Sequence, residues 1–257
     1  MKRICLVSDL HCGSDVAVAF PDTITCEEPL STLKLNQVQR YFYDKWKVLE
    51  TQEPYDAVFA LGDLVDGTNR KEMGEGAWTT NLKLQALCAA RGLMRIPLKK
   101  GGVIGVIGGS GYHGGCNPSM DNLVVEIINR LKGNAEWWGL DRIMQVEDCR
   151  FHLCHQISAG FYKGTSLNRE LIYSYIYEKD VDGIIRGHLH SYHMDEVGGR
   201  FAMILPGWKA RDSYLRKQGL RWGHTAVGWV DLLVDGAEWQ RVKHIWELKN
   251  NIPEGRI

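Results

Sequence analysis

The sequence predicts an α/β fold. Short runs rich in valine and isoleucine alternate along the chain with longer segments that have a helical period. The chain has 257 residues, of which 44% are hydrophobic, and this is enough to build one large core. Each apolar run also leads into a histidine or a carboxylate. Because ligands of open α/β sheets bind at the carboxyl ends of the strands, the same pattern predicts where the site lies.

The predicted elements follow one another without an internal repeat or a linker. Five apolar runs are predicted to be strands, at residues 4–8, 57–61, 103–107, 151–155 and 183–186. Four segments with helical spacing are predicted to be helices, at residues 35–50, 78–98, 120–131 and 167–178, with Asn117 and Pro118 at the start of the third. Strand-like runs then follow at 201–205, 226–234 and 239–246. We therefore predict one domain over residues 1–257, with a β-rich C-terminal half from about residue 192 that packs on the same core.

Charge and cysteine content narrow the class of protein. Lysine plus arginine and aspartate plus glutamate both total 31, so no global field attracts nucleic acid or an anionic membrane, although a local basic patch would suffice for nucleic acid. The seven cysteines are scattered and form no C-x-x-C pair, which indicates reduced thiols. The apolar run at the N-terminus is broken by Asp9 and is too short for a signal peptide, and no run approaches the ~20 residues of a membrane span. We expect a cytoplasmic protein without a membrane partner. The sequence does not distinguish a monomer from an oligomer.

Side chains that commonly bind metals follow the predicted strands. In chain order they are Asp9, His11, Asp63, Asp66, His113, His155, His188 and His190. Each has a plainer interpretation alone: the first pair can cap a strand, the Asp63 to Asp66 segment can be a turn, and a single histidine can belong to the core. It is improbable that all of these strand ends carry such groups by chance. The set suits manganese, iron, zinc or nickel, and it has more ligands than one ion needs, which indicates two ions that share a carboxylate.

The third strand leads into a glycine-rich loop at residues 109–114, which matches G-x-G-x-x-G. In a dinucleotide-binding protein the third glycine lies in the start of a helix, with backbone amides directed at the pyrophosphate. Here Gly114 is followed by Gly-Cys-Asn-Pro, so a helix cannot start at Gly114. A dinucleotide-binding loop also gives His113 no role. A nucleotide-dependent oxidoreductase is therefore the weaker alternative. The favoured interpretation is a flexible turn that brings Ser110 or the backbone to a metal while His113 faces the substrate.

Taken in order, these motifs resemble a known superfamily. Asp9-x-His11, Gly62-Asp63-x-x-Asp66, the loop with His113, then His155 and His188-x-His190 resemble the calcineurin-like metallophosphoesterases over residues 4–190. The family usually has Gly-Asn-His followed by an acid, and here Ser110 stands at the asparagine position. That variant and residues 165–170 resemble the phage and prophage branch. The resemblance implies a four-layer α-β-β-α sandwich with mixed sheets, and a location in the cytoplasm of a bacterium or of a phage's host.

The resemblance also implies roles for individual residues. Two divalent transition metal ions would be bound, manganese being favoured over iron, zinc or nickel. The implied ligands are Asp9, His11, Asp63 and His190 for the first ion, and Asp63, Ser110, His155 and His188 for the second. Asp63 would bridge the ions, and a hydroxide bound to them would attack a phosphomonoester or phosphodiester. His113 would stabilise the transition state or protonate the leaving group, which makes Asp63 and His113 the predicted catalytic residues.

Four further features concern the metal ligands' surroundings and the substrate. Asp66 either orients a ligand histidine or only forms the turn, and the turn is favoured. His152 precedes the end of its strand and is a weaker candidate for a metal ligand.

Tyr112 and Arg169 are the predicted substrate-binding residues, although Arg169 and Glu170 can instead form an ion pair. Residues 209–221, which include Tyr214 and precede Trp222, hold five basic residues against one acid and are either a nucleic-acid-binding segment or a solvated loop. The expected partner is a phosphoester, with nucleic acid or nucleotides as candidates, and a non-catalytic metal-binding scaffold is the alternative function.

Overall fold

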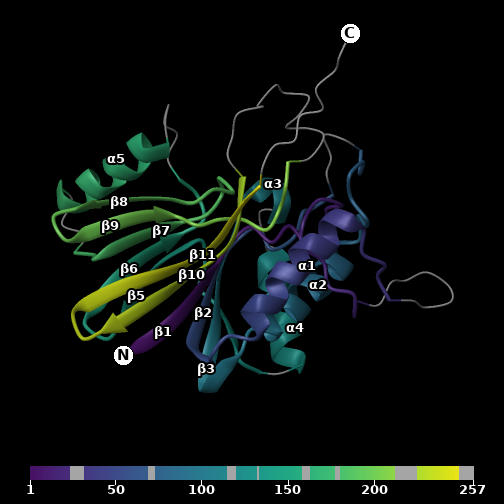
Figure 1. The fold of residues 1–257 in the computed structure, drawn as a ribbon, viewed down its shortest axis with the longest axis horizontal. Coiled ribbons are helices and arrows are strands. Elements are labelled where there is room, and N and C mark those ends of the chain that lie inside the picture. Colours follow the sequence, from purple (N-terminus) through teal and green to yellow (C-terminus); the bar gives the residue numbers. More distant parts are fainter. Residues whose placement is uncertain are drawn as a thin grey trace, which may run out of the picture.

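Two mixed β-sheets form the centre of the computed structural model, and helices lie on their outer faces (Figure 1). The structure describes residues 1–23, 32–68, 73–114, 120–131, 133–157, 163–176, 180–211 and 225–248. The first sheet has six strands in the order β11-β10-β1-β2-β3-β4, and the second has five in the order β5-β6-β7-β9-β8. The strands β1, β2, β3 and β4 run parallel to one another, whereas β10 joins β1 in the antiparallel direction.

The bounds of the elements place the predicted segments. The first sheet consists of β1 (Lys2–Val7), β2 (Tyr55–Leu61), β3 (Leu98–Ile107), β4 (Ala135–Trp137), β10 (Thr225–Asp235) and β11 (Glu238–Leu248). The second sheet consists of β5 (Asp141–Val146), β6 (Cys149–Cys154), β7 (Gly183–Arg186), β8 (His193–Val197) and β9 (Arg200–Ile204). The helices are α1 (Gln37–Glu50), α2 (Leu82–Met94), α3 (Gly111–Gly114), α4 (Met120–Leu131) and α5 (Lys163–Ile176).

Three hydrophobic clusters hold the layers together. On β1, Cys5 and Val7 belong to the cluster under α1, α2 and α4, while Ile4 and Leu6 belong to the cluster between the two sheets. This alternation follows from the two-residue period of a strand that is buried on both faces. A third cluster packs Leu167 of α5 on the outer face of the second sheet. The four-layer α-β-β-α sandwich with mixed sheets is thereby confirmed.

Most differences from the predicted elements have a local cause. The predicted helix 78–98 begins only at Leu82, because the Asn81 side chain accepts hydrogen bonds from the backbone N–H groups of Lys83 and Leu84 and caps the helix there. The prediction missed β4, β5 and β8; β4 has only three residues, and β5 and β8 lie at the edges of the second sheet. Asn117, Pro118 and residues 177–178 of the last predicted helix lie outside the described residues.

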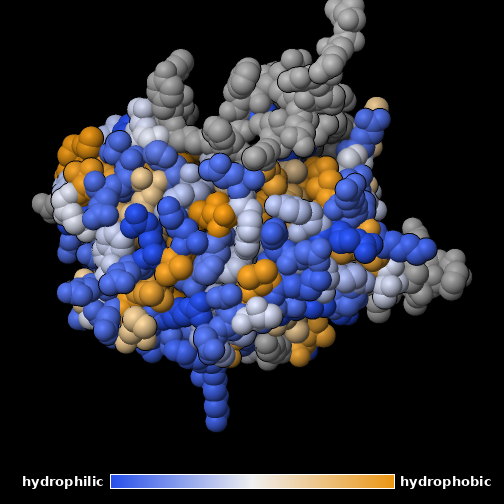
Figure 2. Space-filling view, in the orientation of Figure 1, coloured by the Kyte–Doolittle hydropathy of each residue, from blue (hydrophilic) through white to orange (hydrophobic). Residues whose placement is uncertain are grey.

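The surface is mainly hydrophilic on the face seen in Figure 2, with hydrophobic groups scattered between charged ones. One such group lies over α5, where Ile172 and Ile176 are 56% and 62% exposed. None of the helices in the described residues is long and apolar enough to cross a membrane.

Candidate metal centre

The loops that follow five strands meet at one edge of the two sheets. Backbone hydrogen bonds join them: the His11 N–H group donates to the Asp63 carbonyl (2.9 Å), and the Gly187 N–H group donates to the His155 carbonyl (3.2 Å). A link between the sheets runs from the His188 N–H group to Oδ2 of Asp9 (3.0 Å). The sequence analysis predicted this convergence.

The first group of candidate ligands contains Asp9, His11 and His190. The Nε2 atoms of the two imidazoles are 3.0 Å apart, and Oδ1 of Asp9 lies 3.2 Å from His190 Nε2 and 3.8 Å from His11 Nε2. Ligands bound about 2.1 Å from a metal lie roughly 3.0–3.5 Å from one another, so these separations suit a shared ion. The carboxylate and one imidazole are fully buried, while His190 is partly exposed.

The second group contains Asp63, His155 and the exposed His188. Nε2 of His155 is 3.0 Å from Oδ2 of Asp63, and its Nδ1 lies 2.7 Å from the Leu61 carbonyl, which places the ring proton on Nδ1. The Ser110 hydroxyl lies 3.1 Å from both oxygens of Asp63, and its backbone N–H group donates to Oδ1 (2.6 Å). Ser110 therefore contacts the carboxylate that was predicted to bridge two ions.

Two buried atoms in these groups have no hydrogen-bond partner. They are Oδ1 of Asp9 and Nε2 of His155, which lie 3.9 Å apart. Each atom nevertheless lies at ion-pair distance from a neighbour: Nε2 of His155 is 3.0 Å from Oδ2 of Asp63, and Oδ1 of Asp9 is 3.2 Å from Nε2 of His190. A cation that replaces the proton on His155 would bind the lone pairs of both atoms, so the residues present fit a bound metal ion.

The backbone is strained where the candidate ligands lie. Among the described residues, seven that are not glycine have a positive φ, and five of these are candidate ligands: Asp9, His11, Asp63, His188 and His190. Such conformations are uncommon outside glycine and cost of order 1–3 kcal/mol each. Strain concentrated in this way is typical of a functional site.

Close backbone contacts explain the glycines of the motifs. A β-carbon on Gly62 would overlap the backbone of Gly109, and one on Gly109 would overlap Asp63. A β-carbon on Gly187 would overlap the hydroxyl of Ser8 and lie 3.0 Å from Oδ2 of Asp9. Only glycine lets the loops after β2, β3 and β7 approach the ligands this closely.

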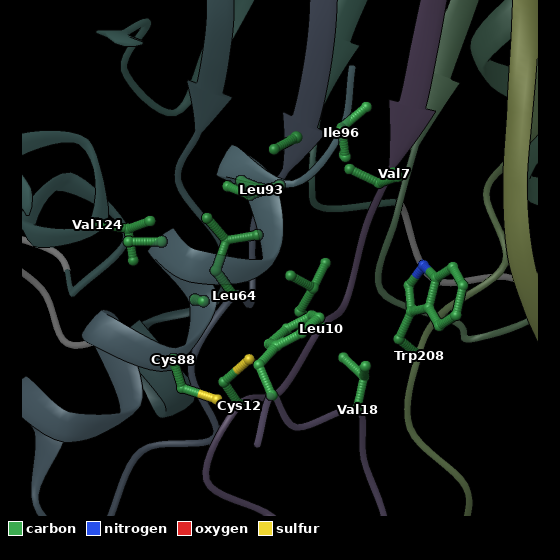
Figure 3. Close-up of a cluster of buried hydrophobic side chains, with 14 of the residues drawn as sticks. Val7, Leu10, Cys12, Val18, Leu64, Cys88, Leu93, Ile96, Val124 and Trp208 are labelled. Carbon is green, nitrogen blue, oxygen red and sulfur yellow. The ribbon is translucent and has the colours of Figure 1, made fainter. Parts of the chain in front are cut away.

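Apolar neighbours in the same loops anchor the site from beneath. Leu10, Cys12 and Leu64 alternate with the polar residues and are fully buried. Figure 3 shows these three side chains in one cluster with Val124 of α4 and Trp208. The backbone that carries the ligands is thus held by the core, which keeps the ligand spacing fixed.

The structure corrects the favoured interpretation of Asp66. Its carboxylate is buried, and Oδ1 lies 3.1 Å from Nδ1 of His11 and 2.8 Å from Nζ of Lys209. Asp66 therefore orients a candidate ligand histidine and is not only a turn residue. Burial opposes ionisation, but the contact with His11 and the charge of Lys209 hold the pKa of Asp66 far below its usual range.

His113 lies on the one-turn helix α3, where the sequence predicted a flexible turn. Its Nδ1–H group donates to the Asp66 carbonyl (2.6 Å), which leaves Nε2 unprotonated. Burial and the neighbouring His11 lower the pKa of His113 to about 4. The neutral ring has no proton to give from Nε2, so the predicted role as a proton donor requires an anionic substrate that first raises this pKa. Tyr112 is 47% exposed, and its ring stands edge-on to that of His113 at a centroid distance of 4.8 Å.

Other predicted residues lie outside these two groups. Glu170 is partly buried and forms an ion pair with the buried Arg186 (2.7 Å), while the alternative ion pair between Glu170 and Arg169 stays a prediction. Arg169 is exposed on α5, and its contact with a substrate stays a prediction. His152 lies 3.0 Å from the same guanidinium and is in none of the metal-ligand groups of the described chain. Tyr214 and Trp222 lie outside the described residues.

Two buried charged residues at the site were missed. Lys209 begins the basic segment that was expected to be exposed, yet it is only 6% exposed and pairs with Asp66. Asp121, in the first turn of α4, is fully buried and accepts hydrogen bonds from Leu64 N (3.0 Å) and Gly109 N (2.7 Å). The only signal in the sequence was an acid at a helix start, which usually has a capping role.

Charge in the site is dominated by carboxylates. Burial raises the pKa of Asp121 to about 6, and the nearby Asp63 adds to this effect. Burial lowers the pKa of His155, but the carboxylates of Asp9 and Asp63 outweigh it and raise this pKa to about 10. In the metal-free protein a proton on His155 therefore partly neutralises the two acids.

The order of the layers, with helices outside two mixed sheets, defines the fold as a four-layer two-sheet sandwich. A particular solved structure with this fold is wild-type Vps29 from Entamoeba histolytica in complex with zinc, at 14% identity and a TM-score of 0.50, covering 97% of this chain and 94% of that one.

Two further solved structures are less similar to this chain. They are an archaeal phosphodiesterase (12% identity, 93% and 98% of the two chains, TM-score 0.49) and a predicted phosphoesterase from Streptococcus pneumoniae (11%, 93% and 87%, TM-score 0.41). No family model and no curated protein matches the sequence.

Proposed function

We propose that the protein is a phosphoesterase of the calcineurin-like metallophosphoesterase superfamily that works with two divalent metal ions. The observation that carries this proposal is a pair of buried atoms with no hydrogen bond among the described residues, Oδ1 of Asp9 and Nε2 of His155, which lie 3.9 Å apart among the candidate ligands. Buried lone pairs directed at one space are what a cation requires.

Two of the candidate groups would hold one ion each. Asp9, His11 and His190 would hold the first, and Asp63, His155 and His188 the second, with Ser110 in contact with the Asp63 carboxylate. The bridging role of Asp63 stays a prediction. When bound, the ions would polarise the phosphoryl oxygens. They would also lower the pKa of a water molecule bound to them, so that a hydroxide is available at neutral pH. Histidine and carboxylate ligands suit manganese, zinc, iron or nickel, and the likeness to a zinc complex makes zinc as well as manganese a metal to test.

The charge of the site favours two ions over one. Among the described residues of the site, the buried carboxylates of Asp9, Asp63, Asp66 and Asp121 are balanced by one buried ammonium, that of Lys209. With neutral histidines, three negative charges remain, so one divalent ion would leave a net negative site that repels phosphate. Two divalent ions would leave a net positive charge, which attracts a phosphoester.

The chain's own residues would hold and orient the substrate. His113 presents an unprotonated Nε2, and the exposed ring of Tyr112 stands beside it, where it can pack on the substrate's leaving group. His188 is the exposed member of the second group and marks the open side of the site. A monoester or a diester substrate, including nucleic acid, stays a prediction. The phage branch and the cytoplasmic location also stay predictions.

The alternative of a non-catalytic metal-binding scaffold rests on Ser110. A hydroxyl is a weaker ligand than the amide oxygen that the family usually places there, and it already contacts both oxygens of Asp63. The scaffold would bind metal and hydrolyse nothing.

The test is metal content by elemental analysis, followed by hydrolysis of a bis-aryl phosphate and an aryl phosphate with manganese or zinc added back. About two ions per chain with turnover would support the proposal, and the preferred ester would name the reaction. Two ions without turnover of either ester would favour the scaffold. A protein that binds no transition metal under any of these conditions would refute both.

A further inference from the structure

Asp121 connects two loops of the candidate metal centre, and none of the ligand groups of the described chain includes it. Its Oδ1 atom accepts a hydrogen bond from the N–H group of Leu64, the residue after Asp63. Its Oδ2 atom accepts one from the N–H group of Gly109, the residue before Ser110. One carboxylate thus holds the backbone beside Asp63 and the backbone beside Ser110.

The two loops depend on this link because they touch each other closely. Gly62 and Gly109 meet without room for a β-carbon, and Asp63 has the strained φ of 48°. The Ser110 N–H group and hydroxyl both contact the Asp63 carboxylate, so a shift of either loop changes that contact. Two hydrogen bonds from a third element resist such a shift.

The third element is itself fixed in the core. Asp121 lies in the first turn of α4, where the helix dipole favours a negative charge. One turn further, Val124 packs in the same buried cluster as the side chain of Leu64 (Figure 3). Leu64 is therefore held twice by α4, through its side chain and through its N–H group.

The charge of Asp121 is also unusual. None of the ion pairs among the described residues includes it, although it is fully buried. A buried carboxylate without a cation is costly, and a divalent ion on the neighbouring Asp63 would offset that cost.

We propose that Asp121 is a positioning residue for the metal centre, holding the loops of Asp63 and Ser110 at their ligand spacing and adding negative charge that favours divalent cations. This inference rests on the proposed function, since it assumes that Asp63 binds metal. It assigns a role to an acid that is 58 positions along the chain from Asp63 and belongs to none of the candidate ligand groups of the described structure.

The test compares Asp121→Ala and Asp121→Asn with Ile128→Ala, a matched control that weakens the same helix at a buried residue two turns after Asp121. Manganese and zinc dissociation constants are measured by calorimetry on chelator-treated protein, and cobalt absorption spectra report the ligand geometry. We expect Asp121→Ala to weaken the metal by ~10–100-fold, the range for residues that orient ligands, and to alter the cobalt spectrum. The asparagine variant, which loses the charge and one acceptor, should also weaken it and replaces the alanine variant if the latter does not fold. Ile128→Ala should lower the melting temperature and leave the dissociation constants unchanged.

Asp121 variants that fold and bind metal with the wild-type constant and spectrum would overturn the inference. So would an equal loss of affinity in Ile128→Ala, which would show a general effect of stability. If the wild-type protein binds no metal, the failure belongs to the proposed function and not to the role of Asp121.

Discussion

Two buried carboxylates near opposite ends of β1 have opposite surroundings. Asp231 of β10 pairs opposite β1 and accepts hydrogen bonds from Tyr55 (2.8 Å), Trp229 (3.0 Å) and Arg3 (2.6 Å), with His244 at 3.3 Å. Both of its oxygens are satisfied by protein donors. At the other end, Oδ2 of Asp9 accepts two hydrogen bonds, whereas Oδ1 accepts none from the described residues and lies 3.2 Å from Nε2 of His190 and 3.8 Å from Nε2 of His11.

The difference separates a structural cluster from a functional one. Around Asp231 the backbone is regular strand and the charges are paired, so the cluster connects β1, β2, β10 and β11 and requires nothing else. Around Asp9 the backbone is strained and a lone pair is unmatched, so the cluster is complete only with an added cation. Substitutions in the two clusters should therefore change different properties.

The largest effect is expected from Asp63→Asn in the functional cluster. A shared carboxylate ligand is lost, and metal stabilisation of a phosphoryl transition state is worth several kcal/mol, so the rate should fall by ~1,000-fold or more. The measurement is kcat/KM for the better aryl phosphate at saturating manganese, with metal content by elemental analysis. The same change at the other end, Asp231→Asn, should leave the activity of the folded protein within about twofold; an equal loss in both would break the comparison.

In the structural cluster, Asp231→Ala should act on stability. It leaves the partly exposed Arg3 without its partner and removes acceptors from Tyr55 and Trp229. Breaking a buried ion pair costs about 3–5 kcal/mol, which we expect as the loss of unfolding free energy in urea. Metal affinity in the fraction that remains folded should not change, and a loss below 1 kcal/mol would mean that the cluster contributes little.

The sequence predicted the polar side chains at the strand ends because each motif is local. Asp9 and His11 lie directly after a strand, as do His188 and His190, so pattern and position suffice. The supporting residues depend on distant contacts instead. Lys209 meets Asp66 across 143 positions, and Arg3 meets Asp231 across 228, and no local pattern carries such pairings.

Lys209→Met tests whether the functional cluster contains one structural pair. The ammonium of Lys209 is 2.8 Å from Asp66 and the side chain is 7% exposed, so its removal should cost about 3 kcal/mol of unfolding free energy in chelator. Because the pKa of Asp66 is lowered in the folded state, this pair stabilises fully above about pH 4, the ordinary pKa of an aspartate, and less as the pH falls below it. The acid side of the stability profile should therefore be shallower in the variant.

A double-mutant cycle with Asp66→Asn assigns this cost to the pair. We expect a coupling energy of about 1–3 kcal/mol, as for residues in direct contact. Additive losses would instead show that Lys209 acts through its other neighbours.

Metal affinity should depend on pH through His155. Its pKa is raised to about 10 in the metal-free protein, so at neutral pH a metal must displace the proton on Nε2. Affinity should rise with pH by up to ~10-fold per unit between pH 6 and 8, measured by calorimetry in buffers of different ionisation enthalpy. A flat profile with no proton release would mean that His155 is not a ligand.

The smallest effect is expected for His244→Phe in the structural cluster. The ring of His244 stacks on Trp229 at a centroid distance of 4.3 Å, and its Nε2 is 3.3 Å from Asp231. Phenylalanine keeps the stacking and removes one of several donors, so the carboxylate stays satisfied and the loss should be about 1 kcal/mol. Urea unfolding of the chelated protein measures it, with wild type as the reference. A loss of unfolding free energy as large as that of Asp231→Ala would show that the Asp231 cluster depends on every one of its donors. The contrast with the cluster around Asp9 would then fail.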